Sequence, residues 1–311
     1  MRNKLFNFVI IIMMIFSFIC TLLYRDLVYD TISYSLHIWV RNLLPSMFPF
    51  FVISDILIEY HITSYIPLWI KRVFSFMFGI TYQVVTIFFL SCFSGFPSNA
   101  RMIRTMYCNG DITLDEANHA LIFTHFSNPL FVISTIGVLF LHQEKYGCII
   151  LISHYLGNFI LGIITRKSNK LCKVHYVNKN NSHLFFGRVL VKAIKSSIDT
   201  LLLILGILTC FLLFSSFVIQ ILPLNSYSSA IIKGILEITM GIKEIADLGI
   251  PDIYKVVISC MFISFGGISV HLQVYSQIVD TKISYHTFFV ARIFHSIISG
   301  SICFLLYMLN S

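Results

Sequence analysis

Charged residues are scarce in this chain. Asp, Glu, Lys and Arg make up only 12% of its 311 residues, whereas about 25% is usual for a soluble domain. Hydrophobic residues account for 57%, and the mean hydropathy is +0.84. A chain with so few charges cannot cover a water-exposed surface, so the composition predicts an all-α, polytopic bundle of membrane helices in contact with the lipid bilayer.

The motifs of common catalytic and metal sites are also missing. The sequence contains no HExxH, GxSxG, Walker GxxxxGK[ST] or GxGxxG motif. Its eight cysteines are spread singly, without a CxxC pair or the Cys/His spacing typical of zinc. We therefore expect a protein that is not an enzyme and that has no cofactor and no metal.

The net charge of +8 is concentrated in one polar connector, which has no acidic residue between positions 166 and 195. Lys and Arg accumulate in cytoplasmic loops of membrane proteins, so we interpret the connector as an orientation signal. The alternative is a binding segment for lipid headgroups or a protein partner. No nucleic-acid partner is expected. The basic residues are Arg166, Lys167, Lys170, Lys173, Lys179, Arg188, Lys192 and Lys195.

Apolar stretches long enough to cross a bilayer recur along the chain, since about 20 such residues suffice. They cover residues 5–23, 36–58, 84–103, 118–141, 146–165, 198–222, 254–274 and 286–309. Residues 62–80 and 227–248 are ambiguous, because each contains charged residues within apolar sequence.

The positive-inside rule favours a crossing for both ambiguous segments. Ten crossings place the first helix, the basic connector and the C-terminus on one side, with both termini cytoplasmic and the two halves inverted. Re-entry of both segments would instead make the halves parallel. We divide the chain into an anchor helix (1–24), a first half with a connecting helix (25–165), the basic connector (166–197) and a second half (198–311).

Two apolar stretches are interrupted by glycine or proline: SCFSGFPSNA contains Gly95 and Pro97, and SFGGISVHLQ contains Gly266 and Gly267. Such breaks free backbone groups that lipid cannot satisfy, so they occur where they face protein or a water-filled cavity. Gly95 and Gly267 are 172 residues apart, and His125 and His295 are 170 apart. This spacing suggests an internal repeat, and paired breaks in two halves point to a transporter-like site.

Polar residues within these stretches are candidates for the same site, because polar groups in a membrane are costly and usually face a cavity or each other. For Glu237 two interpretations stay open: an ion pair with Arg292, or binding of a cation, a proton or a hydroxyl. Ser98 and Ser269 either cap the half-helices that follow the breaks or bind solute. The candidates besides the four break residues are Ser98, Asn99, Asn128, Glu237, Thr239, Ser269, His271, Gln273, Arg292 and His295.

Several motifs, in this order, resemble one known family: LLPSMFPFFVISDIL, SGFPSNARM, FSNPLFV, LEITMGIKEI, and FGGISVHLQVYS followed by ARIFHS. Together they resemble the nucleoside-recognition, or Gate, domain family, in its branch of sporulation integral membrane proteins. The resemblance spans roughly residues 36–305. It implies an endospore-forming bacterium, a role in forming resistant spores, and a fold related to half-helix transporters.

Two functions follow from these observations. The first is a transporter or channel-like component for a small polar solute, nucleoside-like or an ion, with its site near the bilayer midplane. The second is a membrane assembly protein that recruits sporulation membrane proteins or other spore-envelope partners through its basic connector. The first function requires the two breaks to lie close together, with Glu237 at their border.

Overall fold

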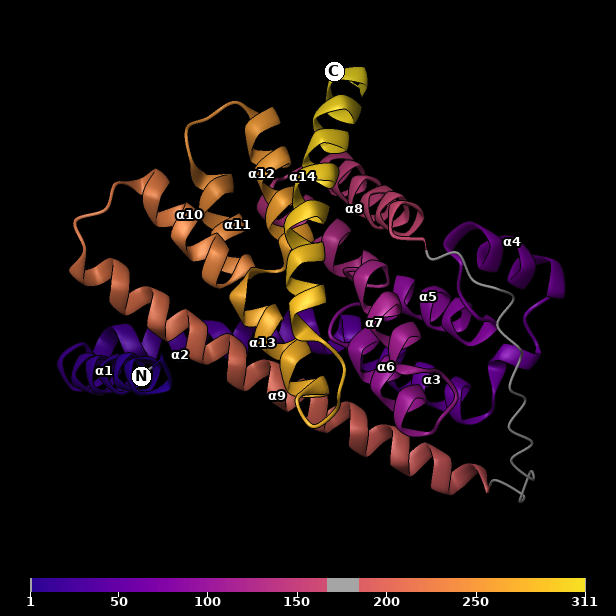
Figure 1. The fold of residues 1–311 in the computed structure, drawn as a ribbon. Coiled ribbons are helices and arrows are strands. Elements are labelled where there is room, and N and C mark those ends of the chain that lie inside the picture. Colours follow the sequence, from indigo (N-terminus) through magenta and orange to yellow (C-terminus); the bar gives the residue numbers. More distant parts are fainter. Residues whose placement is uncertain (1, 167–184, 311) are drawn as a thin grey trace.

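The computed structural model describes residues 2–166 and 185–310, and these are helical with no strand among them (Figure 1). In chain order the elements are α1 (Arg2–Leu23), α2 (Arg25–Ile38), η1 (Trp39–Leu43), α3 (Leu44–Glu59), η2 (Ile62–Ser64), α4 (Leu68–Phe78), α5 (Tyr82–Ser94), α6 (Ser98–Cys108), α7 (Leu114–Phe123), η3 (Phe131–Phe140), α8 (Glu144–Ile164), α9 (Phe186–Ile221), α10 (Ser226–Leu236), α11 (Ile238–Asp247), α12 (Asp252–Phe265), α13 (Gly267–Ile278) and α14 (Tyr285–Asn310).

Five helical stretches are long and apolar enough to cross a membrane. They correspond to the predicted spans at 36–58, 146–165, 198–222, 254–274 and 286–309, which confirms a multi-pass, all-α membrane protein. The five are Arg25–Glu59, Glu144–Ile164, Phe186–Ile221, Asp252–Ile278 and Tyr285–Asn310. Helices α4 and α5 meet at 93°, so the ambiguous residues 62–80 do not form a straight span of their own.

Residues 226–247 form a helical hairpin, not the predicted crossing. Helices α10 and α11 run side by side, with Ser229 Oγ donating to Glu244 Oε2 over 3.1 Å and Lys233 paired with the same carboxylate. A Cβ atom on Gly241 would overlap the Cα atom of Gly234, so the two backbones touch. The chain turns at Glu237. We call residues 226–247 the second hairpin (Figure 1).

Residues 82–108, predicted to span at 84–103, also form a hairpin, with its turn between α5 and α6. Thr86 on α5 bonds to Thr63, just after the end of α3, over 2.7 Å. Arg101 on α6 pairs with Asp55 in the last turns of α3, over 3.1 Å. Thr86 lies in the first half of α5 and Arg101 in the first half of α6, so both arms contact the chain between Asp55 and Thr63. Gly95 forms the turn with φ +75°, a conformation that glycine adopts without strain. We call residues 82–108 the first hairpin.

Two further segments are helices broken midway. Residues 124–128 separate α7 from η3, and we call them the first break. Gly266 and Gly267, both with positive φ, separate α12 from α13, and we call them the second break. The uninterrupted helices α8 and α14 pack closely between them, since a Cβ on Gly157 would lie 2.9 Å from the His295 ring.

The packing of α8 against α14 corrects the predicted topology. Lys145, at the start of α8, donates to the Asn310 carbonyl oxygen at the end of α14. Arg166 follows the other end of α8. Asn310 and the start of the basic connector therefore lie at opposite ends of the two spans, not on the predicted common side. The described residues do not support ten crossings: five stretches, or six if α4 and α5 form one bent span, are long and apolar enough to cross, and two of the predicted crossings are hairpins. Lys167, Lys170, Lys173 and Lys179 lie outside the described residues.

Candidate functional site

The first hairpin meets the first break. A Cβ atom on Gly95 would lie 2.9 Å from Asn128 Cβ, so the hairpin tip touches the unwound segment directly. Asn128 Nδ2 also donates to the Phe93 carbonyl oxygen over 2.8 Å. Only glycine fits this approach, which is a packing reason for Gly95 in addition to its positive φ.

The second hairpin meets the second break in the same way. A Cβ on Gly267 would lie 3.0 Å from Ile238 Cγ2 and 3.3 Å from the Gly234 carbonyl oxygen, both next to the hairpin turn. His125 joins the two breaks, since a Cβ on Gly266 would lie 3.7 Å from His125 Nε2. The four interruptions therefore form one contiguous region. Gly95 and Pro97 were predicted to lie close to the second break. In the structure residues 124–128 lie between them and connect the two.

Protein side chains satisfy the backbone that the first break exposes. Asn158 Nδ2 donates to the His125 carbonyl over 2.6 Å, and Tyr155 Oη donates to that of Ser127 over 3.3 Å. The Ser127 N–H donates to His154 Nε2 over 3.0 Å. Unpaired backbone groups would cost several kcal/mol each in a membrane, so these contacts explain how the segment remains unwound.

Arg292 belongs to this backbone-supporting network. Its Nη2 donates to the Ile122 carbonyl, and Nη1 donates to Asn158 Oδ1 over 3.2 Å and to His295 Nδ1 over 2.8 Å. Within residues 2–166 and 185–310 the fully buried guanidinium has no carboxylate partner. The predicted ion pair between Arg292 and Glu237 is therefore absent.

The hydrogen bonds also assign the proton of the buried His154 and place His295 beside it. His154 Nε2 accepts from a backbone N–H, so its Nδ1 carries the proton and donates to Ser264 Oγ over 3.0 Å. His295 lies among a donor and two carbonyls: its Nδ1 meets Arg292 Nη1 over 2.8 Å and the Ser264 carbonyl over 3.1 Å, and its Nε2 meets the His154 carbonyl over 2.8 Å. We infer that the His154 ring is neutral, because a second proton, on Nε2, would face the Ser127 N–H.

Asn128 uses every atom of its amide on the protein. Its Oδ1 accepts from the N–H groups of Leu130 and Phe131, at 2.9 and 3.2 Å, and so caps the following helix. Its Nδ2 donates to the carbonyls of Phe93 and Ser46, both over 2.8 Å. The residue is fully buried, and its geometry is that of a structural anchor.

Glu237 caps α11 at the tip of the second hairpin. Its Oε2 accepts from the Met240 N–H over 3.0 Å, and its Oε1 accepts from Thr239 Oγ1 over 3.0 Å. The side chain is only 2% exposed, and no cation pairs with it within the described part of the chain. The contact between Ile238 and Gly267 places this carboxylate beside the second break, at the predicted border.

Two more predicted residues are buried on α13. His271 Nδ1 meets the Tyr285 hydroxyl over 3.0 Å, and its Nε2 meets the Phe265 carbonyl over 3.0 Å, so both ring nitrogens have partners. Gln273 is 5% exposed. Pro97 precedes the first residue of α6 at the tip of the first hairpin.

Ser98, Asn99 and Ser269 retain polar atoms without partners. Ser98 Oγ, Asn99 Nδ2 and Ser269 Oγ are buried and make no hydrogen bond within the described residues. They lie in the first turns of α6 and α13, the helices that follow the first hairpin tip and the second break. The alternative that these serines cap their helices is therefore wrong, because neither hydroxyl accepts a backbone N–H.

The site prediction omitted His125, His154 and Asn158. All three are fully buried and contact the breaks. The signal for them was present, since each is a polar residue within a stretch predicted to be in the membrane. They were missed because apolar flanking sequence does not show which side chains support a break.

Charged contacts fix the second arm of the first hairpin, starting about one turn after its tip. Arg101 Nη1 donates to Ser196 and Thr200 on α9, over 3.0 and 3.2 Å. Arg104 Nε donates to Asp280 Oδ1 over 3.1 Å, in the loop between α13 and α14. This hydrogen bond lowers the pKa of the Asp280 carboxyl. Within the described residues, the tip before these contacts is therefore free of charged anchors.

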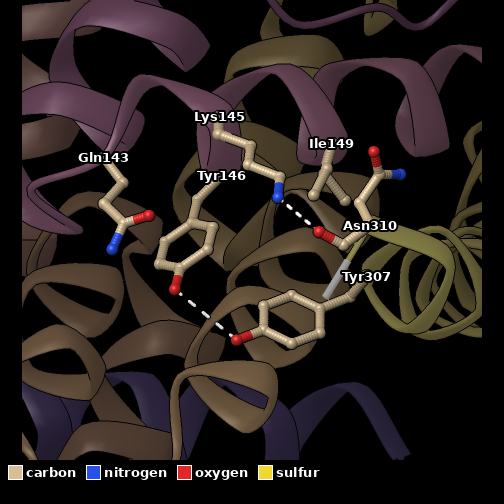
Figure 2. Close-up of a pocket in the computed structure, with 6 residues that line it drawn as sticks. All are labelled: Gln143, Lys145, Tyr146, Ile149, Tyr307 and Asn310. Atoms are coloured by element: carbon tan, nitrogen blue, oxygen red, sulfur yellow. Dashed lines mark hydrogen bonds between the residues drawn. The ribbon is translucent and has the colours of Figure 1, made fainter.

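A separate small pocket lies at the outer end of α8 and α14, away from the breaks. Its volume is about 180 Å³. Figure 2 shows the Tyr146 and Tyr307 rings facing each other across it, with Lys145 bonded to Asn310 beside them. Tyr146 Oη also donates to Asp252 over 2.9 Å, which ties the start of α12 to this end. The remaining lining residues are Gln143 and Ile149.

Comparison with known proteins agrees with the motif resemblance. Residues 40–144 match the Gate family, described as nucleoside recognition. This range includes the first hairpin and the first break. The chain is also similar to the sporulation integral membrane protein YlbJ of Bacillus subtilis (strain 168), with 25% identity over 309 residues, covering 88% of this chain and 76% of the relative. No solved structure matches.

Proposed function

We propose that this protein is a transporter or channel-like component for a small polar, nucleoside-like solute in the membrane of a spore-forming bacterium, and that it has no catalytic activity. One observation carries the proposal: two hairpin tips and two helix breaks converge on buried polar atoms that the fold leaves unpaired. Transporters place discontinuous helices at the bilayer midplane in this way. The Gate match and the similarity to a sporulation protein support the solute class and the setting.

We also propose an inverted repeat, in a register that differs from the predicted one. The spacing of about 170 residues equates Gly95 in a hairpin tip with Gly267 in a broken span. Pairing by element instead equates the two hairpins, the two broken helices, and α8 with α14. Because α8 and α14 are antiparallel, halves paired in this register have opposite directions. Inverted repeats of this kind occur in many secondary transporters.

The positive-inside rule orients the proposed transporter. Arg166 lies on the connector side of α8, and Arg188, Lys192 and Lys195 begin α9. We place this side in the cytoplasm. Asn310 then faces outward, while the predicted cytoplasmic location of the N-terminus remains a prediction.

Cysteine labelling tests this orientation. In a Cys-free protein, an impermeant thiol reagent added to intact cells should modify Asn310→Cys and leave Arg166→Cys unmodified. Lysed cells should show labelling of both, which controls for reactivity. Equal protection of both positions in intact cells would restore the common side and contradict the packing of α8 against α14.

Solute flux tests the function. Full-length protein in liposomes is expected to take up uridine, and Glu237→Gln should reduce the rate about tenfold, the effect of about 1.4 kcal/mol. Glutamine keeps the cap acceptor for Met240 but removes the charge at the hairpin tip. Glu144→Gln, at an exposed carboxylate at the start of α8, is the matched control and should transport normally.

The assembly function makes the opposite prediction. If the wild-type protein moves no solute, Glu237→Gln should sporulate normally, whereas deletion of the basic connector should block sporulation. Under the transport proposal, Glu237→Gln impairs both uridine uptake and the formation of resistant spores.

A further inference from the structure

His125 lies between the first hairpin and the second break, and one of its ring nitrogens, Nε2, has no hydrogen-bond partner within the described residues. Its ring stacks on Phe96 at the first hairpin tip, with centroids 4.9 Å apart, and meets Phe288 of α14 edge-on, also at 4.9 Å. Phe96 and Phe288 thus fix the orientation of the imidazole ring. The residue is fully buried, yet its Nε2 has no partner in the described part of the chain.

The neighbouring Asn99 has an unpaired hydrogen-bond donor, whereas His125 has an unpaired acceptor. His125 Nδ1 lies 3.4 Å from Asn99 Oδ1. An amide oxygen only accepts, so Nδ1 carries the proton and Nε2 is a bare acceptor. Asn99 Nδ2, on the same amide, keeps its donors free. An unpaired acceptor and an unpaired donor therefore lie close together in a region where each costs about 1–3 kcal/mol.

We infer that His125 and Asn99 recognise an uncharged solute that offers a hydrogen-bond donor to Nε2 and an acceptor to the Asn99 amide. This inference rests on the proposed transport function and specifies the solute for the same site. Ser98 adjoins Asn99 in the chain and Ser269 lies in the first turn after the second break, and their unpaired hydroxyl groups can either donate or accept. On binding, the solute replaces its hydrogen bonds to water by hydrogen bonds to these side chains. The polar atoms of the side chains are then no longer unpaired.

The charged groups nearby disfavour an ionic solute. Both oxygens of Glu237 are occupied by its own helix, and Arg292 directs both terminal nitrogens at protein acceptors. Arg292 keeps one free N–H, at Nε, and its charge opposes a cation. An anion would find that single N–H but no pair of terminal N–H groups for a bidentate contact, because both terminal nitrogens are engaged.

A matched pair of solutes and variants tests the inference. Liposomes with wild-type protein should take up uridine but not uridine 5′-carboxylate, which adds a charge with little change in size. His125→Phe keeps a ring between Phe96 and Phe288 but lacks Nε2, and should reduce uridine uptake about tenfold, equivalent to about 1.4 kcal/mol. His286→Phe, at an exposed position on α14, should transport normally.

A second variant separates recognition from folding. Ser269→Ala removes a hydroxyl that makes no hydrogen bond within residues 2–166 and 185–310, so a purely structural role predicts unchanged uptake. We expect a KM for uridine raised several-fold with a thermal midpoint equal to or above that of the wild type. Normal uridine uptake by both His125→Phe and Ser269→Ala would overturn the inference and leave transport standing, as would equal uptake of the carboxylate. A wild-type protein that moves no uridine would overturn the transport proposal, and this inference with it.

Discussion

Replacing Gly241 by alanine is expected to lower the free energy of unfolding by about 3 kcal/mol, at the upper end of typical overpacking costs. The new methyl group would overlap the Cα and N atoms of Gly234 on the opposite arm of the second hairpin. Backbone atoms cannot rotate aside as a side chain can, so the two arms must separate. Thermal unfolding of the purified protein in detergent measures the loss.

Gly206→Ala provides the matched control. Gly206 lies within α9, and a Cβ atom there would meet nothing within 4 Å. Alanine is favoured over glycine in a helix by about 1 kcal/mol, so this variant should be as stable as the wild type or slightly more so. If Gly241→Ala and Gly206→Ala have the same thermal midpoint, α10 and α11 are not in close contact at Gly241. The hairpin interpretation of residues 226–247 would then fail.

The sequence was sufficient to predict the spans whose apolar character is continuous. Helices α8 and α14 follow the predicted ranges closely, because a bilayer-length apolar run has one stable arrangement in lipid. Breaks at Gly95 and at Gly266–Gly267 were also predictable, since glycine frees the backbone. What the glycines do at those places was not.

The hairpins could not be predicted because a hairpin and a single span have the same hydropathy. In the second hairpin, Lys233 and Glu244 neutralise each other across the two arms, a pairing visible only once the chain folds back. The ten-crossing model counted these charges as part of one helix. Only a contact between residues before and after Glu237 could distinguish a hairpin from a single span.

The spacing of about 170 residues pairs two glycines that have different roles in the structure. Gly95 serves a hairpin turn, Gly267 serves a broken span, and the first break has no glycine at all. That break is made with Asn128 and Pro129, and its backbone is satisfied by Asn158, Tyr155 and His154 from α8. Matching glycine to glycine therefore compared elements with different roles.

Loss of the Asn128 side chain should be among the most damaging single changes in the molecule. The fully buried amide makes four hydrogen bonds: two cap the helix after the first break, and two hold Phe93 of the first hairpin and Ser46 of α3. Asn128→Ala leaves two N–H groups and two carbonyls unpaired. At about 1 kcal/mol or more for each group, the expected loss of unfolding free energy is about 4 kcal/mol.

Asn225→Ala isolates the contribution of capping from that of anchoring. Asn225 caps α10 by accepting from the Ser228 N–H over 2.8 Å, at an exposed position. Its replacement should cost only about 1 kcal/mol, the usual value for a helix cap. Thermal unfolding of both variants gives the comparison. Equal losses would mean that Asn128 acts as a cap alone, and the first hairpin would then need another attachment to the first break. A markedly larger loss of unfolding free energy for Asn128→Ala than for Asn225→Ala supports the role of the Asn128 amide in joining the first hairpin, the first break and α3.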